Sequence, residues 1–200
     1  MRIVMMAGPL ALAIAVPAQA QIGTGWSLDS MSRNLQKDGN VFYSNSGGIE
    51  TFRLNDSSAK RCEQRFTTNY SSGSHQFEGW VRATGTPRSA GNSIQQILSI
   101  TTSGHGDVSQ VRYFSSSGGT LRVLQSGITM TTGVYGVYER INCIHYRSTG
   151  KIELWLNGSK KSTHADAGSS AQYYFKYGIY IAGSSGRPQT QWKSIKVWKK

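Results

Sequence analysis

The sequence predicts an all-β protein, an antiparallel β-sandwich of jelly-roll type. Short runs rich in Val, Ile, Tyr, Phe, Trp and Thr are separated by Gly/Ser clusters such as Ser71–Ser74 and Ser115–Gly119. This pattern is typical of strands joined by turns, at the spacing found in sandwiches. No long segment keeps the apolar period of three to four residues that a helix needs.

The first 20 residues predict a signal peptide. Ile3–Val16 is almost entirely apolar after Arg2, and Pro17–Ala20 supplies the small residues of a cleavage site. The alternative is a transmembrane anchor, but the run is shorter than the roughly 20 residues that a spanning helix needs. We therefore expect no transmembrane anchor, and a secreted or periplasmic chain in which 21–200 forms one domain.

The charge favours an acidic partner. The sequence has 22 Lys+Arg against 10 Asp+Glu, a net charge of +12, of which Arg2 lies in the leader. Such an excess favours anionic polysaccharide, nucleic acid or an anionic envelope surface. Export makes nucleic acid an unexpected partner, and solubility alone would also explain the charge.

Several elements can be placed along the chain. Residues 21–40 are less regular and predict an amino-terminal strap, with Trp26 and Leu28 against a sheet. Lys151–Leu156 alternates and leads into Asn157-Gly158, the dipeptide favoured in two-residue hairpin turns. Gln191–Lys199 alternates with imperfect phase and predicts a closing strand.

Strand alternation sorts a polar segment into two faces. Arg61, Glu63 and Arg65 share one face, opposite Cys62, Gln64 and Phe66. A row of Arg, Glu and Arg cannot form a dry core without dense pairing. Taken alone, this pattern is more often an exposed sheet face than a site.

Two later segments extend this polar face. Gln96 and Leu98 share one face by the same parity. In 174–181 the alternation gives one apolar face, which we predict to be buried in the core: Phe175, Tyr177, Ile179 and Ile181. The opposite face carries Tyr174, Lys176, Gly178 and Tyr180.

Together and in this order, Arg61–Arg65, Gln96–Leu98 and Tyr174–Tyr180 resemble the three signature segments of polysaccharide lyase family seven, the alginate lyases. The resemblance covers the chain from about Ser44 onward at the level of motifs. It implies a jelly roll whose concave sheet forms an open cleft, and cleavage of an acidic polymer by β-elimination. In the family the middle segment reads Gln-Ile-His or Gln-Val-His, whereas Leu98 stands at the histidine position here.

The resemblance also implies roles. Arg61 and Gln96 would neutralise the uronate carboxylate, because an arginine fork binds a carboxylate in two places. Tyr180 would act as base and acid, with Lys176 or Arg65 favouring its phenolate. Substrate-binding residues would be Glu63, Arg65, Lys176 and Tyr174, and we expect a monomer without metal or cofactor.

The leucine restricts the expected substrate. In mannuronate and glucuronate the abstracted proton and the leaving oxygen lie on the same side of the ring, so Tyr180 can reach both atoms. In guluronate they lie on opposite sides, so cleavage needs a second base on the far side of the ring. Leu98 cannot supply that base. Four histidines match no motif position: His75, His105, His145 and His164. His105 follows the middle motif and could approach the cleft from a loop, but a solvated loop histidine is the more common case.

Two other functions remain open. One is a non-catalytic carbohydrate-binding jelly roll for acidic polysaccharide, and the other a basic envelope-associated protein. Glycoside hydrolysis by a carboxylate pair is poorly supported, because Glu63, Glu78, Glu139 and Glu153 share no motif.

The two cysteines, Cys62 and Cys143, lack the spacing of a zinc site. An oxidising compartment would allow them to form a disulfide, and the alternative is two buried thiols.

Overall fold

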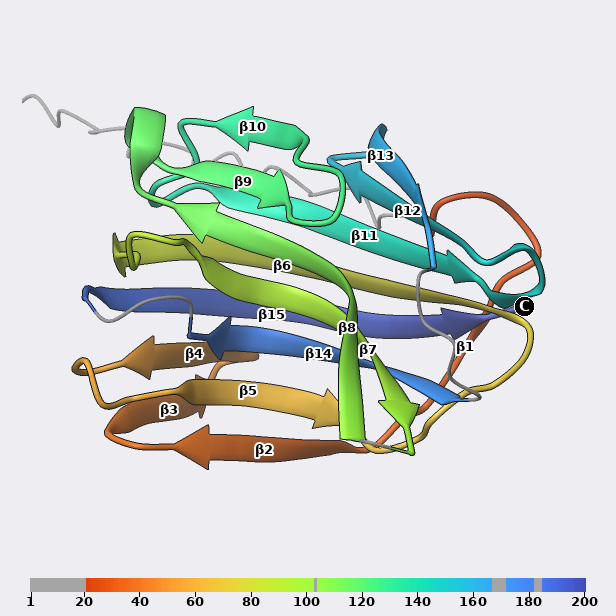
Figure 1. Ribbon diagram of the computed structural model, residues 1–200, viewed down its shortest axis with the longest axis horizontal. Helices are drawn as coiled ribbons and strands as arrows, with labels where there is room; N and C mark the ends of the chain where they lie inside the picture. Colours follow the sequence, from red (N-terminus) through yellow and green to blue (C-terminus); the bar gives the residue numbers. More distant parts are fainter. Residues whose placement is uncertain (1–20, 103, 167–171, 182–184) are drawn as a thin grey trace, which may run out of the picture.

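The structure is a computed structural model that describes residues 21–102, 104–166, 172–181 and 185–200. The predicted signal peptide, 1–20, lies outside these residues. The described residues form two packed sheets, of eight and seven strands, in which all strand pairs are antiparallel (Figure 1). The predicted antiparallel β-sandwich of jelly-roll type is confirmed. None of the described helices is long and apolar enough to cross a membrane.

The strands of each sheet are given in spatial order. The larger sheet contains β13 (Ser159–Ala165), β12 (Lys151–Leu156), β11 (Tyr138–Tyr146), β6 (Ser74–Thr86), β15 (Arg187–Lys199), β4 (Ile49–Leu54) and β3 (Val41–Ser46), with β1 (Ser27–Leu28) paired to β15. The smaller sheet contains β10 (Thr129–Thr132), β9 (Thr120–Val123), β8 (Gly104–Phe114), β7 (Asn92–Thr101), β14 (Gln172–Tyr180), β5 (Arg61–Phe66) and β2 (Arg33–Asp38). Two single 3-10 turns, η1 (Ser116–Gly118) and η2 (Arg147–Thr149), lie between strands.

The core lies between the sheets and follows the predicted alternation. Phe175, Tyr177 and Ile179 of β14 are fully buried, which confirms the core face of that strand. Tyr177 meets Trp192 of β15 with ring centroids 5.4 Å apart. Ile181 lies beyond the end of β14 and is half-buried, so the expected core face ends one residue pair earlier.

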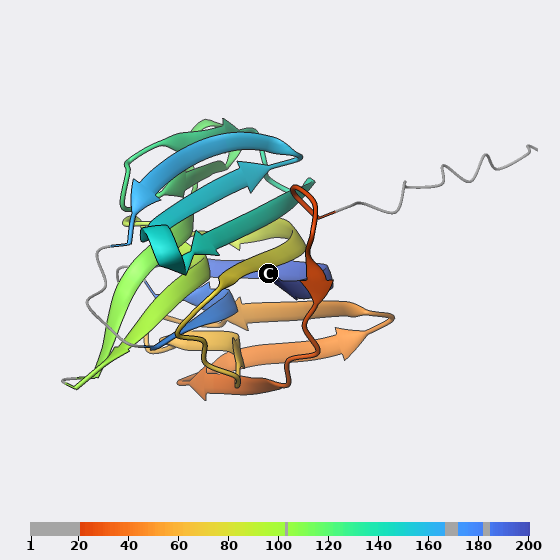
Figure 2. The ribbon, with the colours of Figure 1, turned by 90° about the vertical axis from the view of Figure 1, so that its right-hand side faces the viewer.

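The amino-terminal segment differs from the predicted strap. It crosses one end of the sandwich from the larger to the smaller sheet (Figure 2). The backbone N–H of Ile22 donates to Gln76 Oε1 at 3.0 Å, but Leu28 is 57% exposed rather than tucked against a sheet. Residues 33–38 form the regular edge strand β2, which the sequence did not reveal because its side chains alternate poorly.

The predicted hairpin turn at Asn157-Gly158 and the predicted closing strand are both confirmed. Asn157 and Gly158 join β12 to β13 with φ of 50° and 84°, the left-handed backbone of a two-residue hairpin turn. The imperfect phase of the closing strand has a local cause, a bulge between Lys193 and Lys196 with Ser194 at φ 54°.

The expected disulfide is not formed, and both cysteines are free, buried thiols. Cys62 lies on β5 of the smaller sheet and Cys143 on β11 of the larger sheet. The Cys62 thiol contacts the carbonyl oxygen of Phe42 at 3.4 Å. Burial raises the pKa of Cys62 to about 11 and also raises the pKa of Cys143, so both are inert thiols at neutral pH.

Candidate functional site

The predicted site residues come together on the face of the smaller sheet that is turned away from the core, here called the pocket face. A pocket of about 300 Å³ on this face is lined by Arg61, Glu63, Gln96, Leu98, His105, Asp107, Tyr174, Lys176 and Tyr180. Seven of these nine residues lie in the three segments that the sequence singled out. Arg65 is the predicted binding residue that does not line the pocket.

Strand register explains the convergence. β14 lies between β5 and β7, so residues far apart in the sequence become cross-strand neighbours. Lys176 pairs with Gln96 on one side and with Arg65 on the other. Tyr180 pairs with Arg61. Alternation then points these side chains to the same face.

Glu63 is the buried centre of the pocket, with only 1% of its surface exposed. It accepts a hydrogen bond from Gln96 Nε2, and its Oε2 lies 3.5 Å from Lys176 Nζ. Gly178 lies opposite Glu63 at φ 134°, where an added Cβ would come within 2.5 Å of the Cys62 carbonyl oxygen. A side chain at position 178 would therefore push β14 away from the carboxylate.

Burial opposes both charges of this pair. It raises the pKa of Glu63, against the lowering effects of Lys176, Arg61 and the Gln96 hydrogen bond. It lowers the pKa of Lys176, against the raising effect of Glu63. Each charge is thus held mainly by the other, and an anion entering the pocket meets Arg61 as an additional cation.

Arg61 and Tyr180 form the second part of the pocket. The Arg61 guanidinium carbon lies 5.9 Å from the centre of the Tyr180 ring, and both side chains are half-buried. Arg61 Nε is buried and has no hydrogen-bond partner among the described residues. That nitrogen is out of reach of a ligand, but Arg61 lines the pocket beside the phenol, so its terminal nitrogens can meet a carboxylate.

Arg65 lies outside the pocket lining, against the Tyr174 ring. Its guanidinium carbon lies 4.2 Å from the centre of the Tyr174 ring, and Nη2 donates to Asn69 Oδ1 at 3.0 Å. It can hold Tyr174 in place, but Arg61, not Arg65, is the arginine beside Tyr180.

The sequence interpretation favoured a solvated loop position for His105, which was wrong, and did not consider Asp107. His105 lies on β8 and not in a loop, and its Nδ1 is 3.2 Å from the Tyr174 hydroxyl. Asp107 pairs with Leu98, which shows only 7% of its surface and lines the pocket where a histidine was sought. If residues 104–108 had been predicted to pair with the strand that contains Gln96 and Leu98, His105 and Asp107 would have been placed at the pocket. The sequence does not reveal that register.

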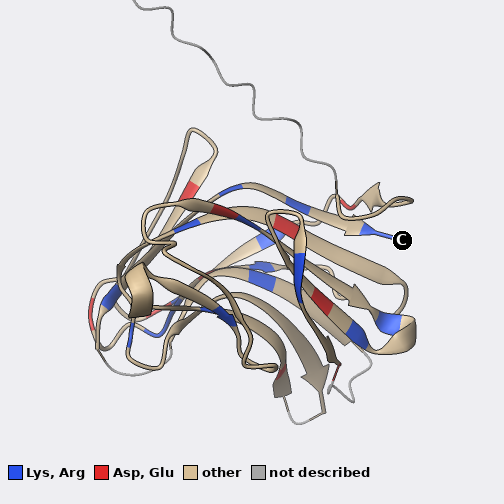
Figure 3. Ribbon diagram, turned by 90° about the horizontal axis from the view of Figure 1, so that it is seen from above, with Lys and Arg blue, Asp and Glu red and all other residues tan. Residues whose placement is uncertain are grey.

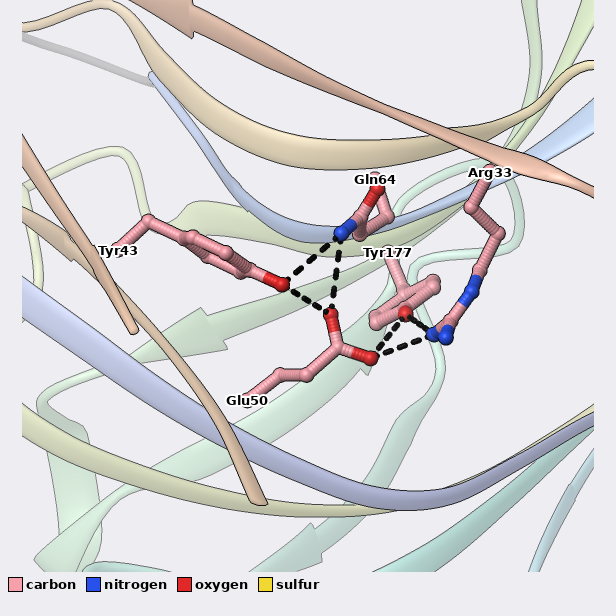
Figure 4. Close-up of polar contacts among 5 residues, drawn as sticks. All are labelled: Arg33, Tyr43, Glu50, Gln64 and Tyr177. Carbon is pink, nitrogen blue, oxygen red and sulfur yellow. Dashed lines mark hydrogen bonds and ion pairs between the residues drawn. The ribbon is translucent and has the colours of Figure 1, made fainter. Parts of the chain in front are cut away.

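A second buried carboxylate lies outside the pocket, between the sheets (Figure 4). Glu50 of β4 accepts hydrogen bonds from Tyr177 at 2.8 Å and from Tyr43 at 3.1 Å. Arg33 Nη1 lies 2.5 Å from Glu50 Oε1, and Gln64 Nε2 donates to Oε2 at 3.2 Å. We call these five residues the Glu50 cluster.

Comparisons with known proteins relate the fold and the sequence to two kinds of protein. No family model matches the chain. A citrate-binding protein of Hevea brasiliensis is 33% identical over 151 residues, which are 74% of this chain and 60% of that protein. The chain therefore spans about 60% of the length of this curated relative.

Solved structures of family-seven alginate lyases share the fold. The lyase PA1167 from Pseudomonas aeruginosa gives a TM-score of 0.65 at 18% identity, over 80% of this chain and 86% of that chain. The lyase AlyA1 from Zobellia galactanivorans gives 0.63 at 19% identity, over 80% and 81%. At these identities the likeness establishes the jelly-roll fold of these lyases and leaves activity to be argued from the site.

Proposed function

We propose that the pocket face binds a uronate residue of an anionic polysaccharide, alginate or a related polyuronate, and cleaves the chain by β-elimination. The observation that carries the proposal is the placement of Arg61, Gln96 and Tyr180 in one pocket around the buried Lys176–Glu63 pair. The chemistry divides into neutralising the carboxylate and moving one proton.

Neutralisation falls to Arg61 and Gln96. The proton beside a uronate carboxylate is barely acidic while the carboxylate stays negative, because removing it adds a second negative charge. The Arg61 guanidinium lines the pocket, and Gln96 has a second amide hydrogen beyond the one given to Glu63. Both can donate to the carboxylate and stabilise the charge that develops on it.

Proton transfer falls to Tyr180. Its ring lies in the pocket, with the Arg61 guanidinium carbon 5.9 Å from the ring centre. The phenolate takes the proton beside the carboxylate, a carbon–carbon double bond forms, and the bond to the glycosidic oxygen breaks. The phenol then returns its proton to the departing oxygen, so the reaction needs no cofactor.

Leu98 sets the substrate preference in this proposal. Tyr180 reaches proton and leaving oxygen from one side, which suits mannuronate-like and glucuronate-like linkages. We further propose that residues 1–20 are a signal peptide, so that the chain is secreted or periplasmic. We propose separately that it acts as a monomer.

A second candidate is a non-catalytic binder of acidic carbohydrate or of a small polycarboxylate. It is favoured by the relative named for citrate binding, at 33% identity, and by Leu98, which removes a proton acceptor from the pocket. The cations that would neutralise a uronate would serve a free carboxylate equally well.

Incubation with a panel of polyuronates separates the two candidates. The lyase candidate predicts ultraviolet absorbance from unsaturated products with polymannuronate or polyglucuronate, and none from the Tyr180→Phe variant. Tight binding of polyuronate or citrate, weakened by Arg61→Ala and accompanied by no product, would establish the binder and overturn the lyase.

A further inference from the structure

The outward face of the larger sheet carries half-buried aromatic side chains where a solvent-facing sheet ordinarily carries small polar ones. Phe77 and Val81 of β6 point into the core, so Trp80 points outward. The same alternation turns Trp155 of β12 and Trp198 of β15 outward. We call the surface around these three tryptophans the outer aromatic face.

Cations lie against the rings of this face. Lys193 Nζ is 4.1 Å from the centre of the Tyr138 ring, and Lys151 Nζ is 4.6 Å from that of Tyr146. Lys196 and Lys160 lie 5.6 Å and 5.7 Å from the rings of Trp198 and Trp155. These contacts hold ammonium groups at the surface beside apolar area. Lys and Arg positions recur along the strands of both sheets (Figure 3).

Two carboxylates of this face, those of Glu78 and Glu153, are buried. Glu78 and Glu153 are 2% and 5% exposed. Glu78 accepts a hydrogen bond from Trp198 Nε1 at 3.2 Å, and Glu153 lies 3.2 Å from Lys151 Nζ. Glu153 also lies 3.5 Å from Lys160 Nζ, so it pairs with both lysines around Trp155. Lys193 and Lys196 form no ion pair with a carboxylate among the described residues, and they remain available to an acidic ligand.

We propose that the outer aromatic face is a second binding surface for an acidic polysaccharide. Sugar rings have apolar faces that pack on half-exposed indole and phenol rings, and regularly spaced carboxylates match lysines spread over neighbouring strands. The surface is an open sheet face, which suits an extended polymer. Because it lies across the sandwich from the pocket face, one molecule can hold two polymer segments and gain affinity by multivalency.

The choice of polymer rests on the proposed function, but binding at this face does not require cleavage. The pocket lining contains no tryptophan, whereas the outer aromatic face contains Trp80, Trp155 and Trp198. Of the other two tryptophans, Trp192 is buried in the core and Trp26 lies in the amino-terminal segment. In a Trp26→Phe background, tryptophan fluorescence during titration with size-fractionated polymannuronate therefore reports on the outer aromatic face. The titration begins with Arg61→Ala/Tyr180→Phe, which disables the pocket.

We expect this pocket variant to keep polymannuronate binding and the fluorescence change. Adding Lys193→Gln/Lys196→Gln should weaken binding about threefold to tenfold at low salt, the effect of two exposed charge contacts. The charge-matched pair Lys37→Gln/Arg122→Gln, two exposed cations on β2 and β9 of the smaller sheet, should change it less than twofold. Equal urea midpoints establish that all variants are folded.

Three results would overturn the proposal: no binding by the pocket variant, equal effects of the two substituted pairs, or equal affinity for duplex DNA and polymannuronate. The last would mean a general polyanion surface. Binding at the outer aromatic face by a wild-type protein that forms no unsaturated product would leave this inference standing and overturn the lyase proposal alone.

Discussion

Two buried glutamates have similar neighbours, but one lies between the sheets and the other lies in the lining of a pocket. Glu50 has partners on all sides between the sheets, namely Arg33, Tyr43, Gln64 and Tyr177 (Figure 4). Glu63 is bonded to Gln96 and Lys176 on the pocket face, where Arg61 and Tyr180 remain open to a ligand. Glutamate, arginine, glutamine and tyrosine thus build a structural cluster in one place and a candidate site in the other.

The difference lies in what the arginine and tyrosine contact. Arg33 and Tyr177 both bond to Glu50 and to each other, and burial raises the pKa of Tyr177 so far that it remains a phenol. Arg61 and Tyr180 lie side by side in the pocket lining, and Arg61 forms no ion pair with a carboxylate among the described residues. Residue type alone therefore cannot identify the site, and uncommitted hydrogen-bonding capacity facing a pocket can.

Replacing each arginine should separate the clusters most clearly. Arg61→Ala should lower polyuronate turnover by roughly a hundredfold to a thousandfold, since it removes the main charge stabilising the transition state, and should change stability little. Arg33→Ala should do the opposite. Initial rates and urea unfolding of both variants test this, and a larger turnover loss in Arg33→Ala would refute the assignment.

Glu50→Ala should lower the free energy of unfolding by about 3 kcal/mol, because it leaves Arg33 and two phenols without their acceptor. This loss of unfolding free energy is at the low end for breaking a buried ion pair, because solvent screens the Arg33 side chain, which is 34% exposed. Urea unfolding measures the loss. A change below about 0.5 kcal/mol, the range of neutral surface substitutions, would mean that the cluster is not structural.

His145 provides a third internal polar contact whose effect depends on pH. Its Nδ1 lies 2.9 Å from the Tyr70 hydroxyl and its Nε2 3.1 Å from Asp166, and burial lowers its pKa to about 4. The unfolded chain, with a histidine pKa near 6.5, binds the extra proton first. Stability should therefore fall as pH drops from about 6.5 to 4, by at most about 3 kcal/mol.

The variant His145→Gln provides the control for that titration. It should be less stable than wild type at pH 7 and should lose less stability on acidification. Urea unfolding at a series of pH values measures both slopes, and parallel slopes would show that another group carries the pH dependence.

Leu98→His should broaden the substrate range. An imidazole beside Tyr174 would supply a base on the far side of a guluronate ring, so polyguluronate cleavage should rise about tenfold or more. Polymannuronate cleavage should change little. Leu98→Asn adds polarity without a base, and an equal gain in that variant would argue against proton transfer by residue 98.

His105→Gln should have the smallest effect, within about threefold on polymannuronate turnover, a small share of what a general base contributes. His105 contacts Tyr174 at the pocket edge and is exposed, whereas the proposal assigns proton transfer to Tyr180. Initial rates decide the matter: loss of cleavage in His105→Gln with activity retained in Tyr180→Phe would reverse the two roles.

Much of the fold and most of the pocket could be predicted from the sequence because alternation is local. The core face of 174–180 and the shared face of Arg61, Glu63 and Gln96 follow from parity once the segments are known to be strands. Alternation does not identify neighbouring strands. The approach of His105 to Tyr174 depends on the β7–β8 register, which the sequence does not state.

The Glu50 cluster was missed for a related reason. Sequence alternation correctly identifies Tyr177 as a core residue, but the other four members of the cluster come from four other strands and share no motif. The phase error in the closing strand likewise arises from the Ser194 bulge, which is a response to packing rather than a pattern in the sequence.

The most direct test of the account compares binding and cleavage of polymannuronate by wild type and Tyr180→Phe. Removing one hydroxyl should leave affinity within about twofold, because the carboxylate contacts of Arg61 and Gln96 remain, and should abolish the ultraviolet signal of unsaturated product. Full activity in Tyr180→Phe would contradict the role of Tyr180. Binding without product in the wild type would contradict β-elimination itself.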